Sequence, residues 1–217
     1  QTIDLLTSHR SIRKFTDEPV DPDLFTRLVE AAQASASSSF LQGVTIIRVT
    51  DPGKRVALRD VAGGQAYVET APEFLVFCAD LSRPMRCCRQ HGGTPAEGLT
   101  EQFVIATVDA ALYAQNLVIA AESVGLGICY IGALRNDPAK VTELLDLPQQ
   151  VYPVFGLCLG HPAQDPEVKP RLPVSVTLKT DSYSTDGEDE AIAAYDEEMR
   201  TYYCLLYTSP SPRDQLT

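Results

Sequence analysis

Apolar and small residues occupy nearly every position of "FVIATVDAALYAQNLVIAAESVGLG", residues 103–127. This pattern predicts one long helix over about residues 97–124, because a helix that is apolar on most faces must be buried. Gly125 and Gly127 mark its end, as glycine commonly does. The stretch is long enough to cross a membrane, but Asp109 lies in its middle, where a charge is costly. We therefore predict a core helix that a second subunit could share.

Shorter apolar runs on either side of this helix predict strands that alternate with helices. The predicted strands, rich in β-branched and aromatic residues, are 44–50, 73–81, 128–134, 151–160 and 174–180. Pro153 indicates a bulge or a sheet edge near the start of the fourth strand. Apolar spacing predicts helices at 2–9, 53–62, 138–145 and 186–203. Another helix begins at Pro22, with Asp21 as its N-cap, and ends at a hydroxyl-rich loop, residues 35–40.

This interleaving predicts a single α/β or α+β layer structure. Residues 82–96 are polar and contain Gly and Pro, which predicts a surface excursion, and residues 161–173 predict an extended loop. From residue 204 to 217 the helical pattern gives way to a Ser- and Pro-rich sequence, "CLLYTSPSPRDQLT". We expect 204–217 to be a non-native tail and the domain to span residues 1–203.

The chain is acidic, with 18 basic and 29 acidic residues and a formal net charge of −11. Non-specific nucleic-acid binding needs a basic surface, so this balance argues against it. A small anionic ligand remains compatible wherever positive charge is concentrated. No secretory signal is visible at the start, and we expect a reducing cytoplasm rather than a membrane or the cell exterior.

The cysteines favour a structural role over metal binding. Cys78, Cys129 and Cys158 lie in apolar, strand-like runs and are expected to be buried. Cys87 and Cys88 precede His91, but no second ligand pair has the spacing of a structural zinc site. We therefore predict no metal centre.

Positive charge is most concentrated in "SHRSIRKF", residues 8–15. On a helical turn Arg10 and Arg13 would share a face and repel each other by about 0.2–0.5 kcal/mol. A phosphate at that turn would relieve the repulsion through charge-assisted hydrogen bonds of about 1.5–3 kcal/mol each. The alternative is that Asp17 and Glu18 simply pair with these arginines at the surface.

A second basic pair occurs in "VKPRLP", where Pro170 and Pro173 favour an extended chain. Alternate side chains of an extended chain point the same way, so Lys169 and Arg171 would form a short fork. On its own such a pair is more often a solvated loop than a ligand clamp.

Five motifs follow one another along the chain: "HRSIRKFTDEPV", "SSSFLQ", "GGQ", "YIGALRN" and "KPRLP". Each is weak alone, but together and in this order they closely resemble the FMN-dependent nitroreductase family, nearest to its oxygen-insensitive, NADPH-dependent branch. The resemblance covers about residues 2–203. It implies an α+β, nitroreductase-like fold, with a central, mostly antiparallel mixed sheet flanked by helices. It also implies a homodimer with the long core helix at the interface.

The resemblance further implies which residues hold FMN. Those expected at its phosphate and ribityl end are His9, Arg10, Ser11 and Arg13. Those expected around the ring are Gln65, the backbone at Tyr130, Ile131, Gly132 and Ala133, and the cationic Lys169 and Arg171, which favour the reduced, anionic ring. Those expected to reach the cofactor from the partner subunit are Ser37, Ser38 and Ser39. Ala133 stands where the family usually has a second glycine, which could narrow the pocket.

The implied activity needs no protein nucleophile, because the flavin carries out the redox chemistry. NADPH would reduce FMN and leave, and a nitroaromatic, a quinone or a free flavin would then accept two electrons in the same cleft. Arg135 is expected to receive the nicotinamide cofactor or the substrate. The NADPH preference is inherited from the family, whose basic C-terminal segment is missing here or replaced by residues 204–217. The alternatives are a flavin reductase that supplies free reduced flavin, and a flavin-binding protein without turnover or an inactive fragment.

Overall fold

A computed structural model describes residues 1–207, with the backbone alone for residues 205–207. The chain forms two compact units, Gln1–Pro166 and a second unit that begins at Glu167. The first unit contains the sheet and most of the predicted site residues. Each unit is described separately below.

The first unit is built on one sheet of four strands, in the order β1-β2-β4-β3. The strands are β1 (Val44–Arg48), β2 (Glu73–Asp80), β3 (Gly127–Ile131) and β4 (Val151–Gly160). All pairings among them are antiparallel. Four of the five predicted strands are therefore confirmed, and the mostly antiparallel sheet implied by the resemblance is also confirmed.

Pro153 lies at a bulge in a central strand. Phe77 pairs with Phe155 and Cys78 pairs with Pro153, so Val154 is an extra residue on β4. A proline cannot donate to a sheet ladder, and a bulge accommodates it within a sheet. The bulge predicted from Pro153 is confirmed. The predicted edge position is also found locally, because β3 pairs only with Gly156–Gly160 and, within residues 1–207, Pro153 has a neighbouring strand on the β2 side alone.

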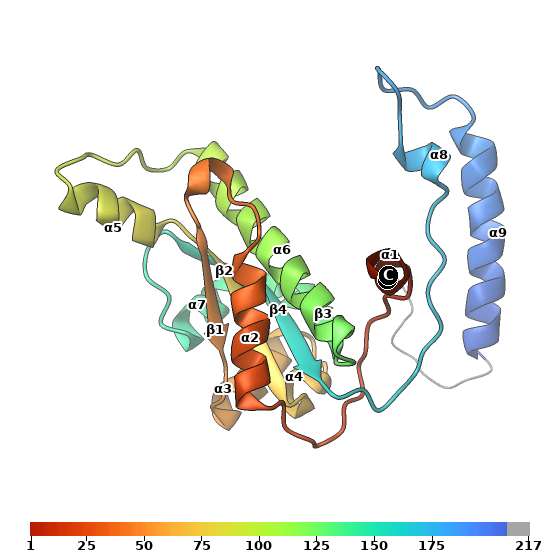
Figure 1. Cartoon of the computed structure of the whole chain (residues 1–217), viewed down its shortest axis with the longest axis horizontal. Coiled ribbons are helices and arrows are strands. Elements are labelled where there is room, and N and C mark those ends of the chain that lie inside the picture. Colours follow the sequence, from red (N-terminus) through yellow and green to blue (C-terminus); the bar gives the residue numbers. More distant parts are fainter. Residues whose placement is uncertain (208–217) are drawn as a thin grey trace. The chain divides into compact units, whose positions relative to one another are not determined.

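Helices cover both faces of this sheet (Figure 1). Those that pack on it are α2 (Pro22–Gln33) and α6 (Thr100–Ser123) on one face, and α3 (Pro52–Val61), α4 (Tyr67–Thr70) and α7 (Pro138–Leu144) on the other. The unit also contains α1 (Thr2–Thr7) and α5 (Ser82–Gln90), with 3₁₀ turns at Ser38–Phe40 and Gly132–Asn136. The predicted cap of α2 is confirmed, because Asp21 Oδ1 accepts from Leu24 N at 2.8 Å. Helix α5 lies inside the segment that was predicted to be a polar surface excursion. It contains three arginines and only one buried residue, Met85, so its sequence shows no repeating apolar positions.

Helix α6 is a core helix on one face only. Together with α2 it packs against Leu75 and Phe77 of β2, and seven of its residues are buried, including Asp109. By length and composition α6 could cross a membrane, but its buried face belongs to the core of this unit. Its other face leaves Val104, Val108 and Leu112 between 42% and 49% exposed.

The opposite face of the sheet packs against α3, α4 and α7. This second core cluster contains the thiols of Cys78, Cys129 and Cys158, which are all buried as predicted. Cys87 and Cys88 lie on α5, where Cys87 is exposed. Among the residues described, no group of three or more His, Cys, Asp or Glu side chains is arranged to hold a metal ion.

The second unit contains an extended segment and two helices, α8 (Val174–Thr177) and α9 (Glu188–Tyr207). The strand predicted at 174–180 is wrong: Val176 N donates to Pro173 O at 3.0 Å and Leu178 N to Val174 O at 2.8 Å. These local bonds form a helical turn after Pro173. The acidic helix predicted at 186–203 is confirmed and continues to Tyr207, inside the segment expected to be a non-native tail. Residues 208–217 of that segment lie outside the described part of the chain.

Gly127 allows the N-terminal segment to lie directly against β3. A Cβ at Gly127 would be 2.6–3.0 Å from three side-chain atoms of Ile12, which is only 5% exposed and β-branched. We expect Gly127→Ala to lower the free energy of unfolding by about 1–3 kcal/mol, as overpacking does. Urea unfolding measures this loss.

The matched control is the double variant Ile12→Ala/Gly127→Ala, which removes Cγ1 and Cγ2 of Ile12, two of the three atoms that crowd the new methyl group, and keeps its Cβ. Its cost should be smaller than the sum of the two single costs. If the cost of the double variant equals the sum of the two single costs, the close contact between residue 127 and Ile12 is contradicted.

Candidate active site

The basic segment 8–15 is not a helical turn. Helix α1 ends at Thr7, and the following residues pair with the sheet instead: Ile12 N donates to Ile128 O at 2.8 Å and Thr16 N donates to His161 O at 2.9 Å. Because this backbone is hydrogen-bonded to other strands, it cannot also form helical hydrogen bonds. The predicted shared helical face of Arg10 and Arg13 is therefore wrong.

Arg10 and His9 each contact a carboxylate that is distant in sequence. His9 Nδ1 lies 2.6 Å from Glu122 Oε1 at the end of α6, and Arg10 forms an ion pair with Asp165. Arg10 and Asp165 both line a cavity of about 570 Å³. The alternative that Arg10 pairs with Asp17 or Glu18 at the surface is wrong, because the carboxylate that Arg10 contacts belongs to Asp165.

Arg13 joins the N-terminal segment to Gln65, although 51 residues separate them in sequence. Arg13 lies close enough to Tyr67 for its charge to act on the phenol, and Tyr67 Oη donates to Gln65 Oε1. Burial raises the pKa of Tyr67 to about 12, an effect that Arg13 opposes only in part. The phenol therefore stays protonated near neutral pH and remains a donor. Gln65 Nε2 in turn donates to Ala62 O at 2.8 Å, which fixes the orientation of its amide.

The end of β3 offers backbone groups at an edge of the sheet. Ile128 O accepts from Ile12 on the side away from β4, and alternate residues of a strand direct their backbone groups the same way. The backbone N–H and C=O of Tyr130 therefore face the same edge. Burial, reinforced by the charge of Glu122, raises the pKa of Tyr130 well above its usual range.

The turn that follows β3 contains the glycine expected beside the flavin ring. A Cβ at Gly132 would lie 3.1 Å from Arg135 Nη2. Arg135, expected to receive the nicotinamide cofactor or the substrate, donates through Nη1 to Val154 O at 2.6 Å. Its guanidinium is thus held against the bulge of β4 in this structure. Ile131 is buried, and Ala133 is half-buried at the start of the turn.

The serine-rich loop lies at the opposite end of the sheet from the basic segment (Figure 1). It precedes Val44, which pairs with Ala79, whereas the basic segment contacts Ile128 and His161 near the other end of β4. Ser37 is half-buried, and Ser38 and Ser39 are exposed. Ten residues of β4 span about 30 Å, so one chain does not bring these serines to Arg13.

Lys169 and Arg171 both belong to the second unit. Lys169 Nζ lies 6.0 Å from the ring centroid of Tyr203, and Arg171 is exposed. Residues 164–173 form neither helix nor strand, and the extended fork of Lys169 and Arg171 stays a prediction. Their convergence on one flavin with Arg13 remains a prediction.

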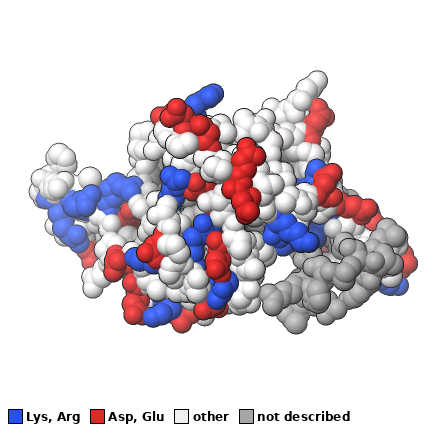
Figure 2. Space-filling view, turned by 90° about the horizontal axis from the view of Figure 1, so that it is seen from below, with Lys and Arg blue, Asp and Glu red and all other residues white. Residues whose placement is uncertain are grey.

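Figure 2 shows acidic and basic side chains interspersed, with basic ones gathered at the left end, where Figure 1 places α5. The sequence alone did not single out Tyr67, Glu122 or Asp165, which contact the predicted site residues. Nothing local distinguishes them from surface residues. Asp109 did leave a signal, because it is the one carboxylate in the middle of an apolar helix.

Comparisons with known proteins agree with this geometry. The model of the nitroreductase family matches residues 6–161, and that of its C-terminal domain matches residues 169–213. The chain is 48% identical over 213 residues to the oxygen-insensitive NADPH nitroreductase of Salmonella typhimurium, covering 98% of this chain and 86% of that protein. It is also 48% identical over 202 residues to the NADPH-flavin oxidoreductase of Vibrio harveyi, covering 93% and 82%.

A solved structure supports the same assignment. The crystal structure of nitroreductase A from Vibrio parahaemolyticus superposes with a TM-score of 0.88 at 48% identity, covering 93% of this chain and 84% of that one. Fold and sequence therefore agree over most of both proteins. The chain belongs to the nitroreductase family.

Proposed function

We propose that this protein is an FMN-dependent oxidoreductase that uses NADPH to reduce nitroaromatics and quinones by two electrons. The observation that carries the proposal is the placement of Arg13 beside Tyr67, whose phenol donates to Gln65, so that an arginine and an amide lie in one site. An arginine suits a phosphate, and an amide suits the polar edge of a flavin ring. Two relatives that are each 48% identical to this chain carry names that include NADPH: one is called a nitroreductase and the other a flavin oxidoreductase.

The residues present fit FMN. Ser11 and Arg13 are two residues apart in a segment that pairs with β3, so their hydroxyl and guanidinium donors share one face toward the phosphate end, whereas Arg10 is held by Asp165. Gln65 and the open backbone edge at Tyr130 provide donors and acceptors for the ring. The guanidinium of Arg135 lies over Gly132, so a planar group would approach this turn once Arg135 has left Val154, and Ala133 adds one methyl group beside it.

When bound, FMN supplies the two-electron redox chemistry that no side chain here could supply. The chain's own residues bind and orient it. Arg13 would hold the negative charge of the FMN phosphate. At the ring end of FMN, the protonated Tyr67 keeps the side chain of Gln65 in place. We further propose that Lys169 and Arg171 add positive charge beside the ring, and that Arg135 leaves its contact with Val154 to receive NADPH or the acceptor.

A homodimer would complete this site. Val104, Val108 and Leu112 recur every four residues and form an exposed apolar stripe on α6, which a second copy would cover. Because Ser37, Ser38 and Ser39 lie at the far end of the sheet from Arg13, they would reach a flavin only from the partner subunit. We place the enzyme in the cytoplasm.

Purification of the full chain tests the proposal. We expect a yellow protein with flavin absorbance, bleached by NADPH without oxygen and recoloured by a nitroaromatic. A colourless protein that also fails to take up added FMN would overturn the proposal. A yellow protein that neither NADPH nor NADH bleaches would favour a flavin-binding protein without turnover.

A second candidate is a flavin reductase that releases reduced flavin. Relatives named FMN reductase (NADPH), from Bacillus subtilis, and NADPH-flavin oxidoreductase favour it. Competition between free FMN and a nitroaromatic in steady-state assays separates the two functions. A larger kcat/KM for free FMN would identify the flavin reductase.

A further inference from the structure

One buried carboxylate holds both ends of the serine-rich loop. Asp109 is only 2% exposed, and it accepts from Ser37 Oγ at 2.6 Å and Ser38 N at 3.2 Å at the start of the loop. It also accepts from Gly43 N at 3.2 Å at the end of the loop. The loop is thereby closed on α6 across a single side chain.

Within this closed loop the backbone is strained. Ser39, Phe40 and Gln42 have φ values of 49°, 55° and 52°, in the left-handed region that residues other than glycine rarely adopt. Such conformations persist only where surrounding contacts impose them. The strained residues are exposed, so packing does not impose their shape. Hydrogen bonds are the contacts that can: those to Asp109, one within the loop from Gln42 N to Ser37 Oγ at 2.7 Å, and those from Arg83.

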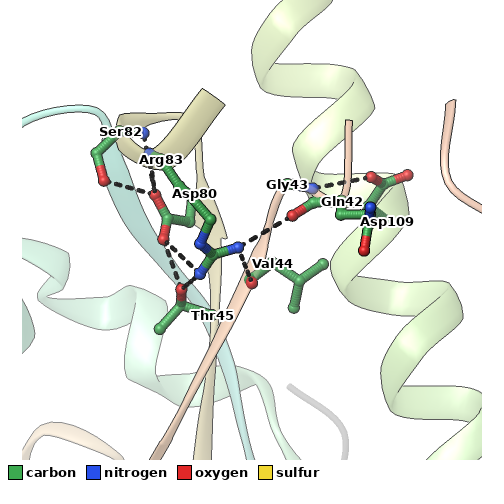
Figure 3. Close-up of polar contacts among 8 residues, drawn as sticks. All are labelled: Gln42, Gly43, Val44, Thr45, Asp80, Ser82, Arg83 and Asp109. Carbon is green, nitrogen blue, oxygen red and sulfur yellow. Dashed lines mark hydrogen bonds and ion pairs between the residues drawn. The ribbon is translucent and has the colours of Figure 1, made fainter. Parts of the chain in front are cut away.

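A second anchor holds the end of the loop from α5 (Figure 3). Arg83 Nη1 donates to Gln42 O at 3.2 Å and to Val44 O at 3.0 Å, while Arg83 Nη2 pairs with Asp80 at 3.2 Å. Hydrogen bonds from Thr45 and Ser82, together with the charge of Arg83, outweigh burial and lower the pKa of Asp80, so this carboxylate is ionised at neutral pH.

A cavity of about 100 Å³ lies at the loop, and its lining is mixed: Ser37, Gln42, Arg83 and Asp109 line it together with Ala36, Val44 and Tyr113. The loop is therefore not supported by close packing at this cavity. Its shape depends on these polar contacts. Asp109 joins both ends of the loop, and it also holds Ser37, whose Oγ accepts from Gln42 N at 2.7 Å.

We propose that Asp109 is a positioning residue that holds the Ser37–Gly43 loop in the strained shape in which its serines contact the flavin of the partner subunit. This inference rests on the proposed function. It extends that function to a residue that touches neither cofactor nor substrate.

The test uses Asp109→Asn, which keeps the shape of the side chain but turns one acceptor into a donor. Amide hydrogen exchange at Ser38 and Gly43 in flavin-free protein should accelerate by roughly 10-fold, as expected when a hydrogen bond to a charged group is lost. The FMN dissociation constant should rise by about 3- to 10-fold, because the competent loop is populated for a smaller fraction of the time. Ser37→Ala should change both quantities in the same direction.

Glu101→Gln is the matched control, since Glu101 is an exposed carboxylate on the same helix. It should leave both quantities unchanged. Unchanged exchange in both test variants would overturn the anchoring role, and accelerated exchange with unchanged FMN affinity would overturn the link to the flavin. The exchange experiment uses no flavin, so failure of the wild-type protein to bind FMN would be recognised separately as failure of the proposed function.

Discussion

Replacing Arg13 by alanine is expected to weaken FMN binding by about 10- to 150-fold, because a hydrogen bond between charged groups contributes about 1.5–3 kcal/mol. The loss should be larger than the loss of fold stability. Arg13 is half-buried, outside the two buried core clusters, and its charge acts on the phenol of Tyr67. Fluorescence titration of the flavin-free protein measures the affinity, and urea unfolding measures the stability.

Lys14→Ala is the matched control for Arg13→Ala. Lys14 is the next residue, carries the same charge and is exposed. If only net charge attracted the flavin, both variants would weaken binding equally, and the assigned site would be wrong. A tenfold or larger difference between them would locate the effect at the guanidinium of Arg13.

The features of the fold that were predicted correctly depend on local signals. Asp21 followed by Pro22 is a helix start whose cap bond forms within four residues. The β-branched and aromatic runs of β1, β2 and β4 identify strands without reference to their partners. Pro153 indicated the bulge because a proline has no backbone N–H to donate to the neighbouring strand. Each of these features is decided by a few neighbouring residues.

The errors arose where the partner is distant in sequence. The spacing of Arg10 and Arg13 fits a helical turn, but Ile128 and His161 recruit this backbone into sheet pairing. Conversely, "VSVTLKT" has strand-like residues, yet it forms a helical turn after Pro173. The intrinsic secondary-structure preference of the residues was too weak to determine whether either segment forms a helical turn or an extended strand.

The candidate site shows the same division. Its residues were recognised from motifs, but how Arg13 connects to Gln65 depends on Tyr67, which no motif contains. Likewise, the role of Asp109 required the three donors of the serine-rich loop to be seen around it. The sequence shows which groups are present, whereas the structure shows which of them share hydrogen bonds.

Replacing Phe77 by alanine is expected to lower the free energy of unfolding by about 3–5 kcal/mol. Phe77 is fully buried in the middle of β2, with ring centroids 6.3 Å from Tyr113 of α6 and 5.5 Å from Phe155 of β4. Its removal leaves a cavity between the sheet and α6 that neighbouring rings can only partly fill. Phe77→Leu, which keeps most of the volume, should cost less than about 1.5 kcal/mol.

Comparison with Arg13→Ala separates the core from the site. A ligand that binds only the folded state raises its stability by an increment set by ligand concentration and dissociation constant. Saturating FMN should therefore add the same increment to Phe77→Ala as to the wild-type protein, because Phe77 lies in the core cluster that faces α2 and α6. Arg13→Ala should lose most of that increment while keeping its stability without flavin. Loss of the increment in Phe77→Ala, measured by urea unfolding with and without FMN, would mean that the core cavity also distorts the flavin site.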